Sequence, residues 1–487
     1  MTSRETLAWA TLAAPALTAA VICLTPQRLV TRAAVAGACG TAALALALAA
    51  LALADPGETF ADKQIAVDAA GGLLLAVIAV VGLASVLVSP AYLATVRTSL
   101  FSVARRQRAY YVVLFAFWTA LLGVPIAGNL GVAWLLIEAT TAASALLVGF
   151  SGKARALEAG WKYLILTSLG LGVALIGIVM LAAGVPGGGL GALSWHALPT
   201  YAGEPGTALV AYLLLLAGLA AKIGWAPVHN WLPDAHSEAP PPVSALLSAA
   251  LLPAVLLVAW RSEHALAPIV GLRTAQDVLL AFGLVSLAVA VPFLWRPMAW
   301  KRLLAYSSLE HMGVIALGIG FGTPLALAGV AIHIAAHAVA KSLGFYAATP
   351  LLGHDPRAAG HAVTGIGRTQ RPLGTTLGIS LGTLAGLPPS PLFVSEVLIV
   401  AGGFEAGRSW AAAAATALLA LGFLGLAHAL IETTSGKSHR RDSALAPGLR
   451  GVMVLTTVSV ALLAGLALAG VWLPGSELVQ ALTKGIS

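Results

Sequence analysis

Long apolar runs separated by short polar segments organise the whole chain. A run of roughly 17 to 25 apolar residues is long enough to cross a bilayer as a helix, and about fourteen such runs follow one another. They lie at about residues 5–25, 31–54, 69–93, 109–124, 130–150, 159–184, 206–227, 242–260, 275–295, 302–320, 325–350, 374–400, 410–431 and 452–473. The pattern predicts an all-α polytopic membrane protein with about fourteen transmembrane helices and no room for a soluble domain.

Composition agrees with this prediction. Hydrophobic residues make up 59% of the chain and charged residues only 9%, with a mean hydropathy of +0.92, whereas soluble domains carry roughly one quarter charged residues. The first run is too long for the apolar part of a signal peptide, so we expect it to be retained. Cys23 and Cys39 are the only cysteines, which excludes a disulfide framework or an iron–sulfur cluster held by this chain alone. We therefore expect no cofactor.

The net charge of +8 does not predict nucleic-acid binding, because the basic residues are spread between the runs. Four of them, Lys63, Arg261, Arg273 and Arg408, follow even-numbered runs. Eighteen follow odd-numbered runs: Arg28, Arg32, Arg97, Arg105, Arg106, Arg108, Lys153, Arg155, Arg296, Lys301, Arg302, Arg357, Arg368, Arg371, Lys437, Arg440, Arg441 and Arg450. By the positive-inside rule the odd loops are cytoplasmic and both termini lie on the opposite face. We expect a multi-pass protein of the prokaryotic inner membrane.

Four charged residues lie inside apolar runs, namely Glu138, Lys222, Lys341 and Glu396. A charge at bilayer depth costs about 2.5 to 3.5 kcal/mol even on lenient scales, so such residues mark ion pathways or pair with one another. The alternative is a structural salt bridge, which is a poor stabiliser compared with apolar packing. We predict that these four residues carry protons. Lys162, near the start of its run, could instead extend its ammonium to the surface.

Prolines interrupt two of the runs beside these charges. Pro227 follows Lys222 by five residues, and the segment LPPSP at 387–391 precedes Glu396. Proline removes a backbone donor and breaks a helix. Broken helices at membrane depth are tolerated where the freed backbone lines a hydrated cavity, and in transporters they mark ion sites. We therefore predict that helices 7 and 12 are broken.

The charged residues also repeat along the chain at separations of 172, 179 and 174 residues. The pairs are Glu138 with Glu310, Lys162 with Lys341, and Lys222 with Glu396. Each separation equals five helices, an odd number, so the two copies must cross the membrane in opposite senses, as in many transporters. The sequence predicts four parts: helices 1–3 (1–104), a first inverted repeat of helices 4–8 (105–265), a second of helices 9–13 (266–435) and helix 14 (436–487).

Histidines add a possible proton relay. His333 and His337 lie eight and four residues before Lys341 and share its helical face. A metal site is the alternative, but two histidines without a neighbouring carboxylate or thiolate lack a third ligand, so we expect no metal. Further candidates for the relay are Lys162, near the start of the sixth run, His229 and His236, placed toward the cytoplasmic mouth, and Glu310 and His311, placed near the start of the tenth run.

No phosphate-binding loop, zinc-protease motif or nucleophile elbow is present, so an independent enzyme is not expected. The segments AKIGWAPVHNWLPDAHSEAP, KRLLAYSSLEHMG, HIAAHAVAKSLGFY and LAGLPPSPLFVSEVLI resemble the antiporter-like proton-conducting subunits of respiratory complex I and the Mrp antiporters. The strongest resemblance is to the membrane component F of hydrogenase-4. It covers roughly residues 105 to 430.

The resemblance implies fourteen helices, two inverted five-helix repeats and a hydrated axis along the membrane plane. It implies that Glu138, Lys222, Lys341 and Glu396 are the charges of helices 5, 7, 11 and 12. Many members carry a lysine in helix 8, where this chain has Pro253, so water or His311 and Glu310 would have to join the two halves.

The function implied is proton translocation within a redox-driven complex, such as a membrane-bound hydrogenase or a complex I relative. Partners would be other membrane subunits, including a hydrogenase or quinone-reducing module, in a lipid bilayer. The alternatives are a redox-independent cation/proton antiporter, with Na⁺ in place of the proton, or a bicarbonate-uptake membrane subunit.

Overall fold

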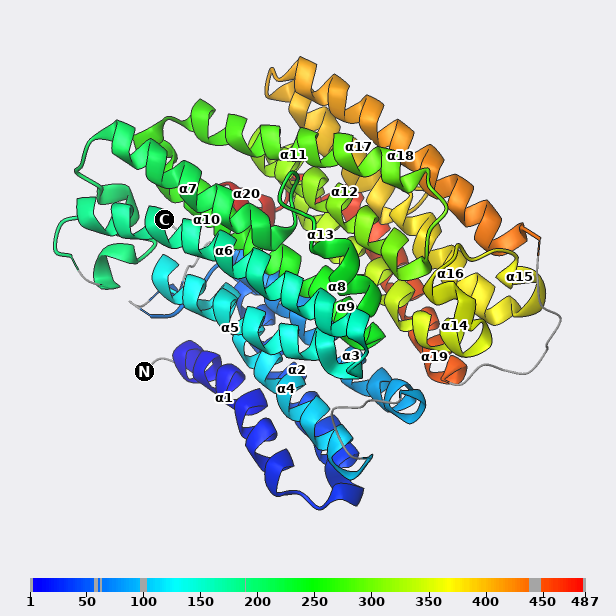
Figure 1. Ribbon diagram of the computed structural model, residues 1–487. Helices are drawn as coiled ribbons and strands as arrows, with labels where there is room; N and C mark the ends of the chain where they lie inside the picture. Colours follow the sequence, from blue (N-terminus) through cyan, green and yellow to red (C-terminus); the bar gives the residue numbers. More distant parts are fainter. Residues whose placement is uncertain are drawn as a thin grey trace.

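The computed structural model describes residues 3–56, 60–61, 64–96, 103–188, 190–437 and 448–484. Helices account for nearly all of these residues and form one elongated bundle (Figure 1). Lys63, Arg97, Arg440 and Arg441, which contribute to the expected charge asymmetry of the loops, lie outside the described ranges.

The first half of the chain forms seven long helices with short connecting elements. The α-helices are α1 (Ser3–Leu24), α2 (Val30–Ala54), α3 (Ala69–Thr95), α4 (Val103–Ile126), α5 (Leu130–Val148), α6 (Ala154–Gly184) and α7 (Pro205–Ile223). The connectors are the 3₁₀ turns Gln27–Leu29, Gly149–Ser151, Leu190–Leu193 and Leu198–Thr200 and the strands β1 (Phe60–Ala61) and β2 (Ala66–Val67). The strands pair antiparallel, with Phe60 opposite Val67.

The second half contains more interruptions. Its α-helices are α8 (Leu232–Glu238), α9 (Pro241–Leu246), α10 (Leu252–Val270), α11 (Leu272–Leu294), α12 (Trp300–Phe321), α13 (Pro324–Tyr346), α14 (Ala348–His354), α15 (Ile366–Thr369), α16 (Arg371–Leu384), α17 (Pro391–Glu405), α18 (Ser409–Ser435), α19 (Leu449–Trp472) and α20 (Glu477–Lys484). A π-helical turn, Leu247–Leu251, joins α9 to α10, and 3₁₀ turns occupy Pro356–Ala359 and Leu473–Gly475.

Thirteen segments of the described chain are long and apolar enough to cross a membrane. The one predicted run that is not among them, the twelfth at 374–400, is divided between α16 and α17, each of which is too short alone. The prediction of an all-α polytopic membrane protein is confirmed. The inverted relationship of its two halves stays a prediction.

Both predicted helix breaks are present. The helix α7 ends at Ile223, where Gly224 takes a left-handed conformation with φ of 80°, and α8 begins only at Leu232. Left-handed glycines of this kind commonly end helices. Likewise α16 ends at Leu384, and α17 restarts with Ser390 as its cap, whose hydroxyl accepts a hydrogen bond from Phe393 N. Both interruptions, at 224–231 and 385–390, therefore contain prolines from which the sequence predicts them.

The centre of the bundle is formed by α9, α10 and α12. The most apolar windows of the segments Pro241–Val270 and Trp300–Phe321 are completely buried, whereas α1, α18 and α19 are largely exposed. Small residues let neighbouring helices approach closely. A side chain at Gly218 of α7 would collide with the Gly170 carbonyl of α6.

Candidate functional site

Lys222 lies in the last turn of α7 and is fully buried. Its ammonium donates hydrogen bonds to the Thr141 hydroxyl of α5 at 2.6 Å and the Tyr163 hydroxyl of α6 at 2.5 Å. The Tyr163 hydroxyl also lies 2.7 Å from the Ser144 hydroxyl. Three hydroxyl groups therefore surround the end of α7 and connect it to two neighbouring helices.

Glu138 belongs to the same cluster but does not touch Lys222. Its Oε1 accepts a 2.5 Å hydrogen bond from the Ser168 hydroxyl of α6, while Oε2 is buried without a hydrogen-bond partner in the described part of the chain. No ion pair within 4.0 Å joins Glu138 to Lys222 among the described residues, although the carboxylate is close enough to act on the ammonium electrostatically. The two charges are thus coupled through space and not locked together.

Lys341 is the corresponding buried lysine of the second half. It lies on α13, is fully buried, and donates to the Leu304 carbonyl at 2.8 Å and to the Ser307 hydroxyl, both on α12. Glu310, also on α12, acts on it electrostatically. Both lysines therefore keep neutral oxygen partners with an acidic residue at longer range.

His236 occupies a different position from the expected one. The sequence places it toward the mouth with His229, but only His229, in the break between α7 and α8, is partly exposed. His236 is fully buried on α8. Its ring centroid is 5.4 Å from Phe345 and 6.4 Å from Trp231, and it lies within electrostatic range of Lys341. The break after α7 turns α8 inward, which places an imidazole between the two lysine clusters.

The eighth predicted span, which the structure forms as α9, a π-helical turn and α10, has a serine hydroxyl in its centre and no lysine. The π-helical turn Leu247–Leu251 lies just before Pro253, and π turns occur frequently at functional sites. Within it the Ser248 hydroxyl lies 2.7 Å from the Ser308 hydroxyl of α12. Pro253 follows the π turn inside a helical segment that runs unbroken from Pro241 to Val270, so it is an interior proline of that segment. The central helices are therefore bridged by polar side chains although the lysine is missing.

A histidine cluster lies between α12, α13 and α17. His311 Nδ1 is 3.1 Å from His333 Nε2, and His333 Nδ1 is 2.9 Å from the Ser395 hydroxyl. The His337 ring centroid is 5.1 Å from that of His311. Glu396, one residue after Ser395, is partly exposed and brings its carboxylate close to His311 and His333. Lys341 acts electrostatically on this cluster.

Two sequence expectations about this cluster are corrected. Glu310 and His311 lie in the middle of α12, which begins at Trp300, and both are buried instead of lying near a helix start. The imidazole partner of His333 is His311 on the neighbouring helix, and a carboxylate, Glu396, is close at hand. Helix packing, which the spacing along one helix cannot reveal, brings these groups together.

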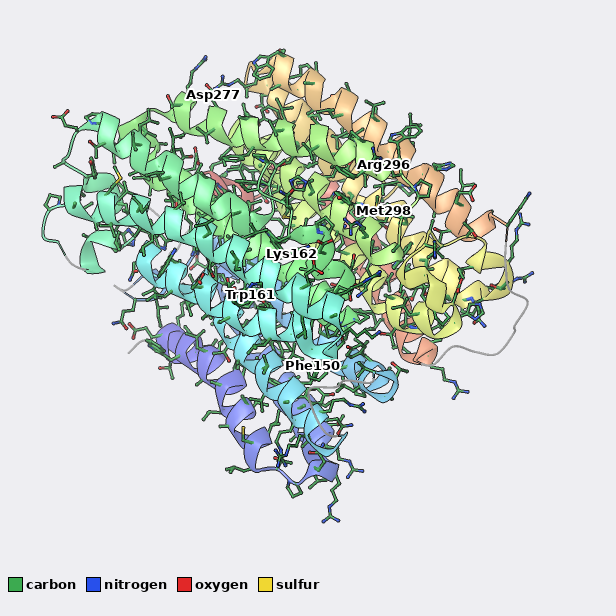
Figure 2. The ribbon with its side chains drawn as sticks, in the orientation of Figure 1. Phe150, Trp161, Lys162, Asp277, Arg296 and Met298 are labelled. Atoms are coloured by element: carbon green, nitrogen blue, oxygen red, sulfur yellow. The ribbon has the colours of Figure 1, made fainter. Side chains whose placement is uncertain are left out.

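Lys162 lies at the surface and outside the buried clusters. Its ammonium is 2.5 Å from Glu158 and 3.9 Å from Asp234, and Arg302 binds the same Asp234 at 2.9 Å. Figure 2 shows Lys162 on α6 beside Trp161. A pocket lined by these charged residues and Met298 opens here. The expected extension of the Lys162 side chain to the surface is present, and the pocket forms a polar mouth beside α8.

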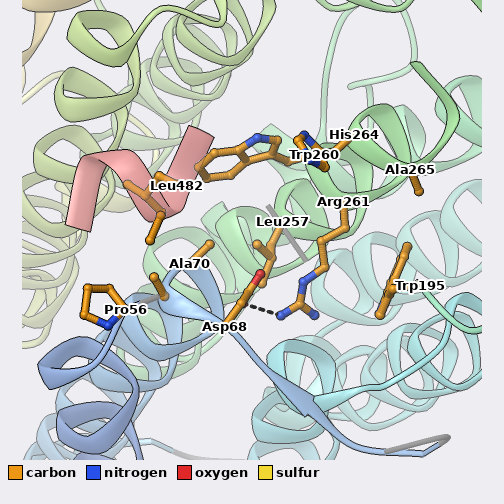
Figure 3. Close-up of a pocket in the computed structure, with 12 residues that line it drawn as sticks. Pro56, Asp68, Ala70, Trp195, Leu257, Trp260, Arg261, His264, Ala265 and Leu482 are labelled. Carbon is orange, nitrogen blue, oxygen red and sulfur yellow. Dashed lines mark hydrogen bonds and ion pairs between the residues drawn. The ribbon is translucent and has the colours of Figure 1, made fainter. Parts of the chain in front are cut away.

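Arg261 is a buried charge that the sequence pattern places in a loop. The helix α10 continues to Val270, and Arg261 within it is 5% exposed. Its guanidinium binds Asp68 at 2.7 Å and the Pro125 carbonyl at 3.0 Å, facing Trp195 (Figure 3). Asp68 also caps α3 by accepting from Gly71 N. This pair ties α10 to α3 away from the lysine clusters.

Several site residues give no charge signal in the sequence because they are neutral. Thr141 follows Glu138 by three residues and Ser144 follows Thr141 by three, so each successive pair lies on adjacent turns of α5. That spacing could have identified them. Tyr163 and Ser307 carry no such signal, because their roles depend on which helices pack together.

Comparison with known proteins agrees with this geometry. Residues 127–422 match the model of the family described as NADH:quinone oxidoreductase/Mrp antiporter, transmembrane. The matched segment includes both lysine clusters and both broken helices. The chain belongs to this family.

The chain is also similar to individual relatives in sequence and to solved structures in fold. It is 34% identical over 340 residues to the hydrogenase-4 component F homolog of Methylacidiphilum infernorum, covering 69% of this chain and 70% of that protein. Its fold is similar to a chain of the membrane-bound sulfane sulfur reductase, an archaeal respiratory membrane complex, with a TM-score of 0.83, 20% identity and coverage of 98% and 97%. It is also similar to a chain of the Mrp complex from Dietzia sp. DQ12-45-1b, with a TM-score of 0.81 and 20% identity. This match covers 99% of this chain and 100% of that chain.

The family membership decides the class of protein. The chain is an antiporter-like, multi-pass membrane subunit, and relatives that it matches are named as a hydrogenase-4 component F homolog and as subunit N of NADH-quinone oxidoreductase. The resemblance predicted from the sequence is confirmed. The roles of individual residues stay predictions.

Proposed function

We propose that this chain translocates protons as a membrane subunit of a redox-driven complex related to membrane-bound hydrogenases and complex I. The observation that carries the proposal is the pair of fully buried lysines, Lys222 and Lys341, each bound to neutral oxygens within hydrogen-bonding distance. A buried lysine without a tight counter-charge can release its proton readily, because burial opposes the charged form. Arginine in either position could not do so.

The proposed route follows the buried polar groups from one half to the other. It begins at Glu138 and Lys222, passes the inward-facing His236 and continues to Lys341. From there it reaches the histidine cluster of His311, His333 and His337 and leaves near Glu310 and Glu396. His236 takes the position between the lysines, with the Ser248 and Ser308 hydroxyls nearby. Lys162 and His229 serve at the mouth.

Control of the route is proposed to lie in the separation of Glu138 and Lys222. A carboxylate that approaches an ammonium favours its charged form, and a carboxylate that withdraws lets the proton leave. The two groups are coupled without an ion pair, so a small movement of α5 relative to α7 changes their interaction. A neighbouring subunit could drive that movement.

The proposed setting is the prokaryotic inner membrane, with the odd loops in the cytoplasm and both termini on the opposite face. Partners are other membrane subunits joined to a hydrogenase or quinone-reducing module. The similarity to the hydrogenase-4 component F homolog supports this setting over an autonomous antiporter. Whether the chain transports Na⁺ in place of the proton is tested by measuring the flux of both ions.

The test is purification of the native assembly, identification of its subunits by mass spectrometry, and measurement of proton and Na⁺ flux in liposomes. A redox module in the complex, with proton flux that depends on its electron donor, supports the proposal. Full and specific ion exchange by the isolated chain at native rates would instead assign an autonomous antiporter.

A further inference from the structure

The histidine cluster has the composition of a metal site. His311 on α12, His333 on α13 and Glu396 on α17 each offer one ligand atom, and these three atoms lie within 4.8 Å of one another. Zinc is bound in proteins by such imidazole nitrogens and carboxylate oxygens. We propose that these three residues form a binding site for a divalent transition-metal ion of the Zn²⁺ class.

The hydrogen bonds of Ser395 fix the form of His333 that a metal requires. The Ser395 hydroxyl donates its proton to the Leu392 carbonyl at 2.7 Å, so its oxygen must accept from His333 Nδ1, 2.9 Å away. In the neutral ring the proton is therefore on Nδ1, and the lone pair on Nε2 faces His311. Metal-binding histidines are oriented in this way by a partner on the other ring nitrogen.

The distance between the two imidazoles fits a shared ion. Zinc binds nitrogen at about 2.0 to 2.1 Å in a tetrahedral arrangement, which separates two ligand nitrogens by about 3.3 Å. His311 Nδ1 and His333 Nε2 are 3.1 Å apart. On metal binding, the proton on His311 Nδ1 moves to Nε2 or leaves the ring, and the Nδ1 lone pair replaces the hydrogen bond. Glu396 supplies the third ligand, and the fourth position remains for water.

Charges around the site favour a dication. Glu310 lies within electrostatic range of Glu396, so a second carboxyl group adds negative charge near the proposed ligand Glu396, and imidazoles bind metal in their neutral form. A doubly charged ion balances both carboxylates. Lys341 is the opposing charge near both histidines, and it limits the affinity without touching a ligand atom.

The three proposed ligands differ in exposure. His311 and His333 are 1% and 0% exposed, whereas Glu396 is partly exposed. The carboxylate is therefore the proposed ligand nearest the surface of the chain. The proposal does not rest on proton conduction, because its readout is binding.

The native complex, depleted of metal and held in lipid nanodiscs, should be titrated with Co²⁺, and binding should be measured by the visible d–d absorption of the ion. The bound Co²⁺ should then be displaced with Zn²⁺. We expect one equivalent per chain, the intense bands of a low-coordinate ion, and two imidazole ligands in the Zn X-ray absorption spectrum. His333→Gln and Glu396→Gln should each weaken binding more than tenfold. His196→Gln, which alters an exposed histidine, is the matched control and should bind normally.

Ser395→Ala keeps all three ligands and removes only the group that orients His333, so it should weaken binding by about tenfold. If a ligand variant fails to assemble, Ser395→Ala still tests whether these three residues bind a metal ion. The proposal is overturned if the native complex shows no saturable binding. It is equally overturned if Glu396→Gln and Ser395→Ala bind the ion as tightly as the native complex.

Discussion

The ammonium of Lys222 is held by the hydroxyl of Tyr163, at a distance of 2.5 Å, and not by a carboxylate. The ammonium also lies 4.5 Å from the centre of the Tyr163 ring. A cation held by neutral groups can lose its proton without breaking an ion pair. This arrangement is the one we expect of the proposed proton carrier, and it differs from a structural salt bridge.

Removal of the Tyr163 hydroxyl should slow proton transfer while the ring remains in place. A hydrogen bond to a charged group contributes about 1.5 to 3 kcal/mol, so we expect Tyr163→Phe to lower proton flux about 10- to 100-fold in assembled complexes. Tyr212→Phe is the matched control, because the hydroxyl of this buried tyrosine binds the Ala275 carbonyl, away from both lysines. Equal flux in both variants would show that the hydroxyl has no role.

Replacement of Glu138 by glutamine tests the electrostatic control of Lys222. The amide oxygen can still accept the hydrogen bond from Ser168, but the negative charge is lost. We expect Glu138→Gln to assemble normally and to lose most of its proton flux, since no carboxylate remains to change how strongly Lys222 holds its proton. Glu405→Gln, at an exposed glutamate, should keep native flux. Native flux in Glu138→Gln would refute the proposed control.

The pair formed by Arg261 and Asp68 should matter for stability. Removal of one partner from a buried pair costs about 3 to 5 kcal/mol, because the other charge stays buried. Arg261→Met should therefore lower the free energy of unfolding by this amount. The double variant with Arg261→Met and Asp68→Asn should recover part of the loss, because no unpaired charge remains buried. Arg302→Met breaks an exposed pair and should cost about 1 kcal/mol or less. Denaturant unfolding in detergent provides the measurement.

Topology reporters test the proposed orientation. A reporter fused after Lys437 should report the cytoplasm, and one fused after Glu204 the opposite face, because basic loops are retained in the cytoplasm. The reverse result would exchange the two mouths of the proposed route.

The helices and their breaks could be predicted from the sequence because both depend on local properties. Apolar length identified the spans, and Pro227 and the prolines at 388, 389 and 391 identified the two interruptions. Lys222 was recognised because a buried charge is costly at any position in a membrane. These signals do not require knowledge of neighbouring helices.

The contacts between helices could not be predicted in this way. Tyr163 and His236 are common residue types whose roles appear only when α6, α7 and α8 are packed together. Arg261 was misplaced because α10 continues through a polar stretch that resembles a loop. The pairing of His311 with His333 likewise depends on the packing of α12 on α13.

The central claim is that Lys222 carries a proton, and Lys222→Arg tests it most directly. Arginine keeps the positive charge and can donate to Thr141 and Tyr163, but it does not release its proton at working pH. Proton flux per turnover should be measured in assembled, reconstituted complexes, with Lys153→Arg at an exposed position as control. The account predicts normal assembly with flux abolished in Lys222→Arg and retained in Lys153→Arg. Native flux in Lys222→Arg would contradict it.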